Sequence, residues 1–159
     1  MTREILKEKI ERILYECDKH VLRISQAVED LKSIMPLNKQ SYVDLDKDAI
    51  QALDQFLFRF AKLQDAIGRK LFKQILILKE DDALLINNMT FIDILNSLEK
   101  LDIVKTKVWQ RLRDIRNELA YNYDDEPQEM AEVINKIYEE KETLIDIYAH
   151  AKAYYEKIK

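Results

Sequence analysis

Apolar residues recur along this chain with the alternating three- and four-residue spacing of amphipathic helices. The clearest stripe begins near the N-terminus and predicts a first helix over about Thr2 to Met35. Pro36 ends this stripe, and residues 37–46 show no periodicity, so they are expected to form a loop. The stripe consists of Ile10, Leu14, Cys17, Val21, Ile24, Val28, Leu31 and Met35.

A second stripe predicts a helix from about Ile50 to Lys79. Gln64 is the polar interruption of this stripe, and its burial would require hydrogen-bond partners, either at a dimer cleft or on the fourth helix. Gly68 lies inside the same helix, where glycine costs about 1 kcal/mol relative to alanine. We expect a close crossing by another helix to offset that cost.

The second half of the chain carries signals for three more helices. Thr90 and Asp93 resemble a capping box that opens a third helix, which is expected to end near Leu101. A fourth helix follows Asp102 and ends near position 123, and Pro127 suits the first turn of a fifth helix that runs to the C-terminus. The sequence therefore predicts one all-α domain over residues 1–159, an up-and-down bundle of four to five helices.

Composition narrows the classes of function. A single glycine and two prolines leave little turn chemistry for a sheet, and a net charge of -4 argues against a protein that coats nucleic acid by bulk electrostatics. Any RNA contact must then be local. The charge pattern described next fits a basic groove beside an acidic rim, and it also fits a helix face that is simply exposed to water. The cations crowd one segment, and acidic residues follow it directly: Lys105, Lys107, Arg111, Arg113 and Arg116, then Asp124, Asp125, Glu126, Glu129 and Glu132.

Cellular location and metal binding follow from absences in the sequence. Charged residues are interspersed from the N-terminus onward, and no uncharged run is long enough to span a membrane, so we expect a cytoplasmic protein. Cys17 falls on the apolar stripe and is expected to be a core residue. His20 and His150 lack the spacing of a di-metal helical bundle, and neither a metal nor a cofactor is expected.

Residues 111–123 read Arg-Leu-Arg-Asp-Ile-Arg-Asn-Glu-Leu-Ala-Tyr-Asn-Tyr. This stretch resembles the signature of the HEPN superfamily, Arg-Asn-x-x-x-His-x-Tyr, except that Tyr121 stands where the histidine would be. Residues 58–68 and 123–127 resemble the HepT-like branch of that superfamily, the toxins encoded beside small nucleotidyltransferases. The resemblance covers roughly residues 56–127.

The resemblance implies a HEPN-like bundle and a metal-independent ribonuclease toxin that acts as a homodimer, two motifs meeting in a shared cleft. If the resemblance holds, Arg116 would bind the scissile phosphate, Asn117 would orient neighbouring groups, and Tyr121 would occupy the acid/base position. Tyr123 matches the tyrosine to which a cognate nucleotidyltransferase antitoxin attaches AMP. The basic residues expected to extend the RNA contact are Arg113, Lys107 and Arg111.

The change at position 121 affects the chemistry that the family performs. Cleaving RNA without a metal requires one proton transfer from the 2'-hydroxyl and one to the leaving oxygen. A histidine side chain ordinarily has a pKa of about 6.5, whereas only about one tyrosine in a thousand is ionised at pH 7. Because acid/base catalysis contributes about 10²- to 10⁴-fold, we expect the chain with Tyr121 to cleave RNA very poorly.

Structural roles remain open for each of these residues. Arg116 could be a surface cation that complements the helix dipole, and the nuclease interpretation requires that it is not buried in an internal ion pair. The two motif tyrosines could pack against a neighbouring helix, and Trp109 could lie in the core, at a dimer interface or under a base. The alternative function is a non-catalytic helical module that binds a small nucleotidyltransferase.

Overall fold

The structure, a computed structural model, describes residues 2–121 and 126–159, and within these ranges it contains helices and no strand. The prediction of an all-α chain is therefore confirmed. The elements are α1 Arg3–Leu31, α2 Lys39–Val43, α3 Lys47–Asp65, the π-helical segment η1 Ala66–Leu71, α4 Phe72–Glu80, α5 Ala83–Asn87, α6 Phe91–Lys100, α7 Thr106–Tyr121, α8 Pro127–Glu139 and α9 Lys141–Ile158.

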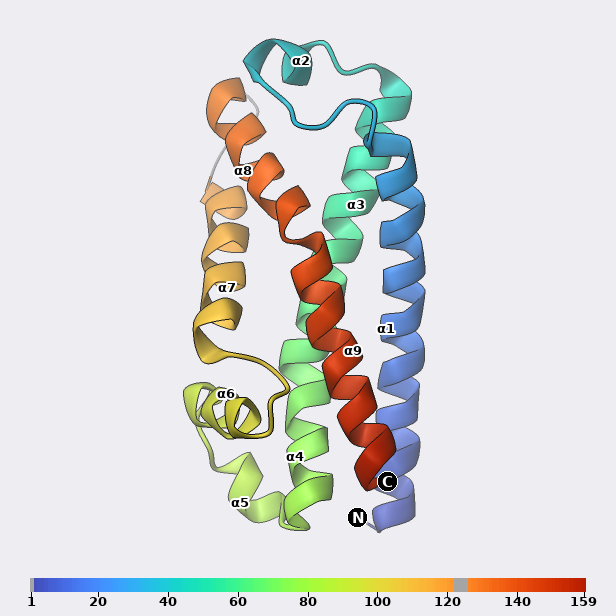
Figure 1. Cartoon of the computed structure of the whole chain (residues 1–159), viewed down its shortest axis with the longest axis vertical. Coiled ribbons are helices and arrows are strands. Elements are labelled where there is room, and N and C mark those ends of the chain that lie inside the picture. The colour runs from blue at the N-terminus through green and yellow to red at the C-terminus, as the bar shows by residue number, and fades with distance from the viewer. Residues whose placement is uncertain (1, 122–125) are drawn as a thin grey trace.

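The long helices run up and down beside one another (Figure 1). α1 spans the length of the molecule, and α3, η1 and α4 form one continuous rod that runs back alongside it. α7 then runs upward on the far side, and α8 and α9 return to the end where the N-terminus lies. α6 is seen almost end-on and lies across the bundle below α7. This arrangement places α7 opposite the rod of α3, η1 and α4.

Side-chain caps and left-handed aspartates define the helix boundaries. Thr90 accepts a hydrogen bond from the Asp93 backbone N–H at 3.2 Å, so the predicted start of α6 is confirmed. Asp81 and Asp102 have positive φ angles of 54° and 59° where α4 and α6 end. These positions usually hold glycine, and aspartate is one of the few other residues that tolerate them.

The helical segments outnumber the four to five predicted. α2 arises within the expected loop because Asn38 and Ser41 cap each other's backbone N–H groups, at 2.9 and 2.8 Å. α5 opens on a similar cap, Asp82 to the Leu85 N–H. The predicted fifth helix is interrupted at Glu140, where ψ is 1°, and this separates α8 from α9. None of these features leaves a hydrophobic stripe in the sequence.

The core confirms the first and second stripes and accounts for the glycine within the second one. Trp109 of α7 is 2% exposed, and a Cβ added to Gly68 would lie 2.8 Å from its Cζ2 atom. The glycine thus permits the close approach between α7 and the rod that the sequence predicts. Cys17 is fully buried, and burial raises the pKa of its thiol to about 12. In the described ranges no helix has both the length and the apolar character needed to cross a bilayer.

Candidate functional site

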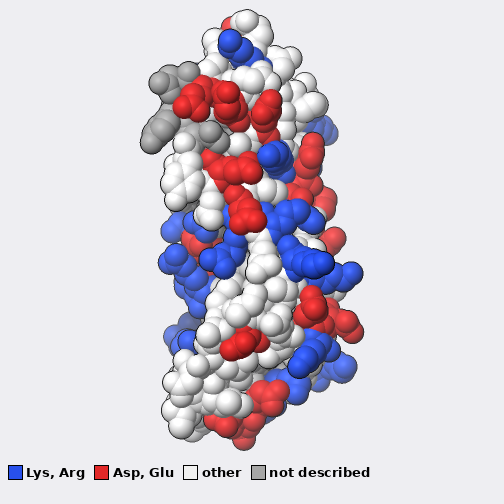
Figure 2. All heavy atoms as spheres, turned by 90° about the vertical axis from the view of Figure 1, so that its left-hand side faces the viewer, with Lys and Arg blue, Asp and Glu red and all other residues white. Residues whose placement is uncertain are grey.

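Basic side chains gather at mid-height on the face that carries α6 and α7 (Figure 2). They lie on both sides of a mostly uncharged strip, and acidic side chains cover the surface above this band. The face therefore concentrates positive charge on a protein whose net charge is -4. An anionic ligand would be attracted to this band and not to the surface as a whole.

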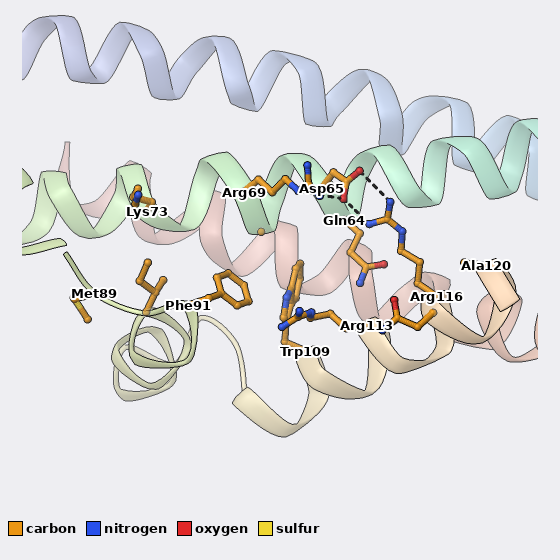
Figure 3. A pocket seen from close by; sticks show the side chains of 13 residues that line it. Gln64, Asp65, Arg69, Lys73, Met89, Phe91, Trp109, Arg113, Arg116 and Ala120 are labelled. Carbon is orange, nitrogen blue, oxygen red and sulfur yellow. Dashed lines mark hydrogen bonds and ion pairs between the residues drawn. The ribbon is translucent and has the colours of Figure 1, made fainter. Parts of the chain in front are cut away.

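A groove of about 670 Å³ opens between the rod and α7, and it is named here the Arg116 groove. α7 contributes one face, since positions 109, 113, 116, 117 and 120 follow the helical spacing. Gln64 extends from the rod toward this face, and Arg116 reaches from α7 to Asp65 on the rod (Figure 3). The lining residues are Gln64, Asp65, Gly68, Arg69, Lys73, Met89, Phe91, Ile94, Trp109, Arg113, Arg116, Asn117 and Ala120.

The π-helical segment η1 lies at the middle of the groove. Gln64 and Asp65 end α3, η1 contributes Gly68 and Arg69, and α4 contributes Lys73. A π-helical turn holds more residues than an α-helical turn, so it shifts the register of the lining face between α3 and α4. Such segments occur often at functional sites. Across this register shift, Arg69 and Lys73 line the same side of the rod as Gln64.

Arg116 forms a bidentate ion pair with Asp65 across the groove. Its Nη1 donates to Oδ1 and its Nη2 donates to Oδ2 at 3.1 Å. The pair is internal to the chain, yet the two side chains remain 37% and 32% exposed. Arg116 is thus paired but not buried. A guanidinium carries five N–H donors, of which the two bonds to Asp65 use two.

Three more cations share the groove with Arg116. The Arg113 guanidinium lies 5.5 Å from the centre of the Phe91 ring, which orients it by a cation–π contact. The Arg69 Nε lies 4.0 Å from Asp65 Oδ1, and the Arg69 side chain is 82% exposed. With Lys73, four basic side chains line the groove, against one carboxylate among the described lining residues. The excess of positive charge suits a polyanion.

The other predicted RNA contacts lie elsewhere. Arg111 donates two hydrogen bonds of 3.0 Å to Glu140, at the break between α8 and α9. Lys107 lines a second groove of about 990 Å³, named here the Lys107 groove, which also contains Glu99 and Asp146. The structure thus brings together Arg113, Arg116 and Asn117 of the predicted set, and separates Lys107 and Arg111 from them.

Tyr121 is not among the residues that line the Arg116 groove. Tyr121 is the last residue of α7 and is 79% exposed, and Tyr123 lies outside the described residues. The two histidines do not supply an imidazole either, because His20 is buried between α1 and α3 and His150 lines the Lys107 groove. Within one chain, the described lining of the groove carries an excess of cations but no histidine for proton transfer.

Three charged residues of the groove, Asp65, Arg69 and Lys73, were not identified from the sequence. Asp65 and Arg69 lie in or beside the stretch that resembles the HepT-like branch, but the pairing of Asp65 with a residue 51 positions away leaves no periodic signal. Arg69 and Lys73 follow Gln64 at five and nine positions, a spacing typical of one face only if a π-helical turn intervenes. Gln64 was singled out by its place in an apolar stripe, and it does lie buried beside α7.

Comparison of the chain with protein-family models, curated proteins and solved structures found no match. In the described ranges no group of three or more His, Cys, Asp or Glu side chains is placed to hold a metal ion. The chemistry of the Arg116 groove follows from its own residues, whose polar members in the described ranges are four cations, two amides and one carboxylate. Such a set binds phosphate through charge-assisted hydrogen bonds, and it offers a metal ion few ligands.

Proposed function

We propose that this protein binds RNA in the Arg116 groove and is a HEPN-type ribonuclease toxin of the HepT-like branch, impaired by Tyr121. The observation that carries the proposal is that four basic side chains, two from α7 and two from the rod, line the groove that also holds the motif residue Asn117. Arginine forks match phosphate oxygens, and in the proposed reaction they neutralise charge on the scissile phosphate without a metal.

Helix geometry supports a homodimer as the working form. Arg116 and Tyr121 are five positions apart on one helix, which separates their directions by about 140°. The two side chains of one chain therefore do not converge on one phosphate, and Tyr121 projects from the exposed end of α7. A second copy would bring its own position 121 toward the first copy's Arg116. The acid/base group of the proposed cleft then comes from the partner chain.

The test is to restore the histidine. Tyr121→His should raise the rate of RNA cleavage by about 10²- to 10⁴-fold, because an imidazole transfers protons near neutral pH and a phenol does not. The matched control is the double variant with Arg116→Gln, which keeps the imidazole and removes the phosphate ligand, and which should be inactive. The readouts are RNA integrity in metal-free buffer and growth of expressing cells. A Tyr121→His protein as inert as the parent would refute the nuclease proposal.

A second candidate function is a non-catalytic module that binds a small nucleotidyltransferase. It is favoured by the Arg116–Asp65 pair, which already engages the guanidinium, and by the exposed Tyr121 ring at the end of α7. On this account Tyr121→His leaves RNA intact, and the aromatic ring contributes to partner binding. Measuring the affinity of both variants for a candidate nucleotidyltransferase, with the mass of the Tyr123 peptide, separates the two functions.

A further inference from the structure

Gln64 is a buried polar residue whose presence the packing of α3 does not explain. Its neighbours on the same helix face, Phe60, Leu63 and Ile67, are 3% exposed or less, and Gln64 itself is 3% exposed. Its Oε1 is buried and accepts no hydrogen bond from the described residues. An unpaired buried acceptor destabilises a folded chain, so a leucine or methionine here would pack at lower cost.

The Gln64 side chain lines the Arg116 groove. Gln64 projects from the end of α3 toward α7, in the space between Trp109 and Arg116 (Figure 3). Arg113 and Arg116 line the same groove from α7. A ligand whose phosphates contact these arginines would therefore bring its next chemical group to the Gln64 amide. That group must donate a hydrogen bond to satisfy Oε1.

We propose that Gln64 reads the base of a single-stranded RNA nucleotide bound in the Arg116 groove, with adenine or cytosine preferred over guanine and uracil. Adenine and cytosine each present an amino donor beside a ring-nitrogen acceptor, and a glutamine amide matches this pair with its oxygen and its NH₂ group. Protein contacts to unpaired RNA bases commonly use such edges. This inference rests on the proposed RNA-binding function and adds a base preference to it. The arginines hold the phosphates, and Gln64 selects the nucleotide.

The experiment compares Gln64→Met with the parent protein for binding to fluorescent oligo(A) and to an abasic oligonucleotide of equal length. Methionine keeps the length of the side chain and removes its hydrogen bonds. We expect Gln64→Met to weaken oligo(A) binding about 10-fold and to leave abasic binding unchanged. The variant should also melt about 3 °C higher, because the unpaired oxygen is gone. Gln64→Leu is the second variant and should behave in the same way.

The outcomes distinguish failure of this inference from failure of the proposed function. Arg113→Gln should weaken binding of both oligonucleotides, since it removes a phosphate contact. If Arg113→Gln does so and Gln64→Met binds oligo(A) as tightly as the parent, base reading is refuted and RNA binding stands. A lower melting temperature for both Gln64 variants would also refute the inference, because Gln64 would then have a structural role. If the parent binds neither oligonucleotide, the RNA-binding function itself fails.

Discussion

Helix α7 borders two grooves that differ in how their charges are used. The Lys107 groove is the larger, at about 990 Å³ against 670 Å³ for the Arg116 groove. Its two lysines, however, share the lining with the carboxylates of Glu99, Asp102 and Asp146. Glu99 also accepts a hydrogen bond from the Thr106 N–H at 2.8 Å. Size therefore does not identify the site. An excess of positive charge and an unpaired buried amide oxygen distinguish the Arg116 groove.

Two arginines of α7 show the same contrast in how their charges are used. Arg111 and Arg116 each form a bidentate pair with a carboxylate, Glu140 and Asp65 respectively. Glu140 is 17% exposed and lies where α8 gives way to α9, so its pair fastens α7 to the bundle. Asp65 lies among three further cations in an open groove. The first pair is structural, and the second leaves positive charge for a ligand.

The largest effect on stability is expected at Trp109, which lines the Arg116 groove. Trp109→Ala should lower the free energy of unfolding by about 3–5 kcal/mol, because it removes a buried indole that packs edge-on against Phe72 at 4.9 Å. Denaturant unfolding measures the change. A loss below about 1 kcal/mol would mean that the indole is not part of the core.

Gly68→Ala sharpens this prediction through a double-mutant cycle. In the parent chain the new methyl group meets the Trp109 ring, so the substitution should destabilise the protein. In the Trp109→Ala background the obstacle is absent, and alanine should stabilise the helix by up to about 1 kcal/mol. The same sign in both backgrounds would contradict the close contact between these two residues.

A medium effect is expected from the carboxylate in the Arg116 groove. Asp65→Asn removes the one acidic side chain among the described lining residues and should strengthen binding of single-stranded RNA about 5-fold, equivalent to about 1 kcal/mol. The cost in stability should stay below about 1 kcal/mol, since both partners of the pair are about a third exposed. Fluorescence titration and thermal unfolding give the two values.

Glu140→Gln is the matched control for that substitution. It removes the carboxylate partner of the other bidentate arginine, Arg111, which lies outside the groove. We expect a small loss of stability and no change in RNA affinity. Equal gains in affinity for both variants would show that overall charge, and not the groove, governs binding.

The smallest expected effect is a pH dependence of stability, and it comes from a buried histidine outside the Arg116 groove. His20 is buried between α1 and α3, where its Nδ1 lies 3.0 Å from Arg59 Nη1 and its Nε2 lies 3.4 Å from Glu16. Burial lowers the pKa of His20; Glu16 opposes the shift, and Arg59 and Lys62 add to it. Since the folded-state pKa lies below the unfolded one, this contribution to stability is present above about pH 6.5 and is lost as the pH falls.

His20→Gln tests this assignment, because glutamine can keep both hydrogen bonds without titrating. The melting temperature of the parent protein should drop more between about pH 7.5 and about pH 5.5 than that of the variant. Identical pH profiles would show that His20 does not contribute to the pH dependence.

The sequence predicts the parts of the fold that repeat. The stripe on α1, the long rod of α3 and α4, and the Thr90 cap of α6 all follow from spacing and capping chemistry. The short helices α2 and α5 and the break at Glu140 do not, because five residues are too few for a stripe and no proline or glycine marks the break. Local capping and tertiary contacts determine them.

The candidate site, too, has some features that follow from the sequence and others that depend on packing. Arg113, Arg116 and Asn117 share one face of α7, and that much follows from helical spacing. The Asp65 partner, the π-helical turn and the separation of Lys107 from Arg113 depend on how α7 packs against the rod. Gln64 is an intermediate case, because the sequence marks it as an exception and the structure supplies the groove that it faces.

The salt dependence of RNA binding decides whether the Arg116 groove holds the RNA. Each phosphate contact to a single strand contributes about 0.7 to the slope of log affinity against log salt. Arg113→Gln should weaken binding and reduce the magnitude of the slope by about that amount, whereas Arg111→Gln, on the other face of α7, should leave both unchanged. If Arg111→Gln reduced the slope as much as Arg113→Gln, or if neither variant changed it, the Arg116 groove would not be the RNA site.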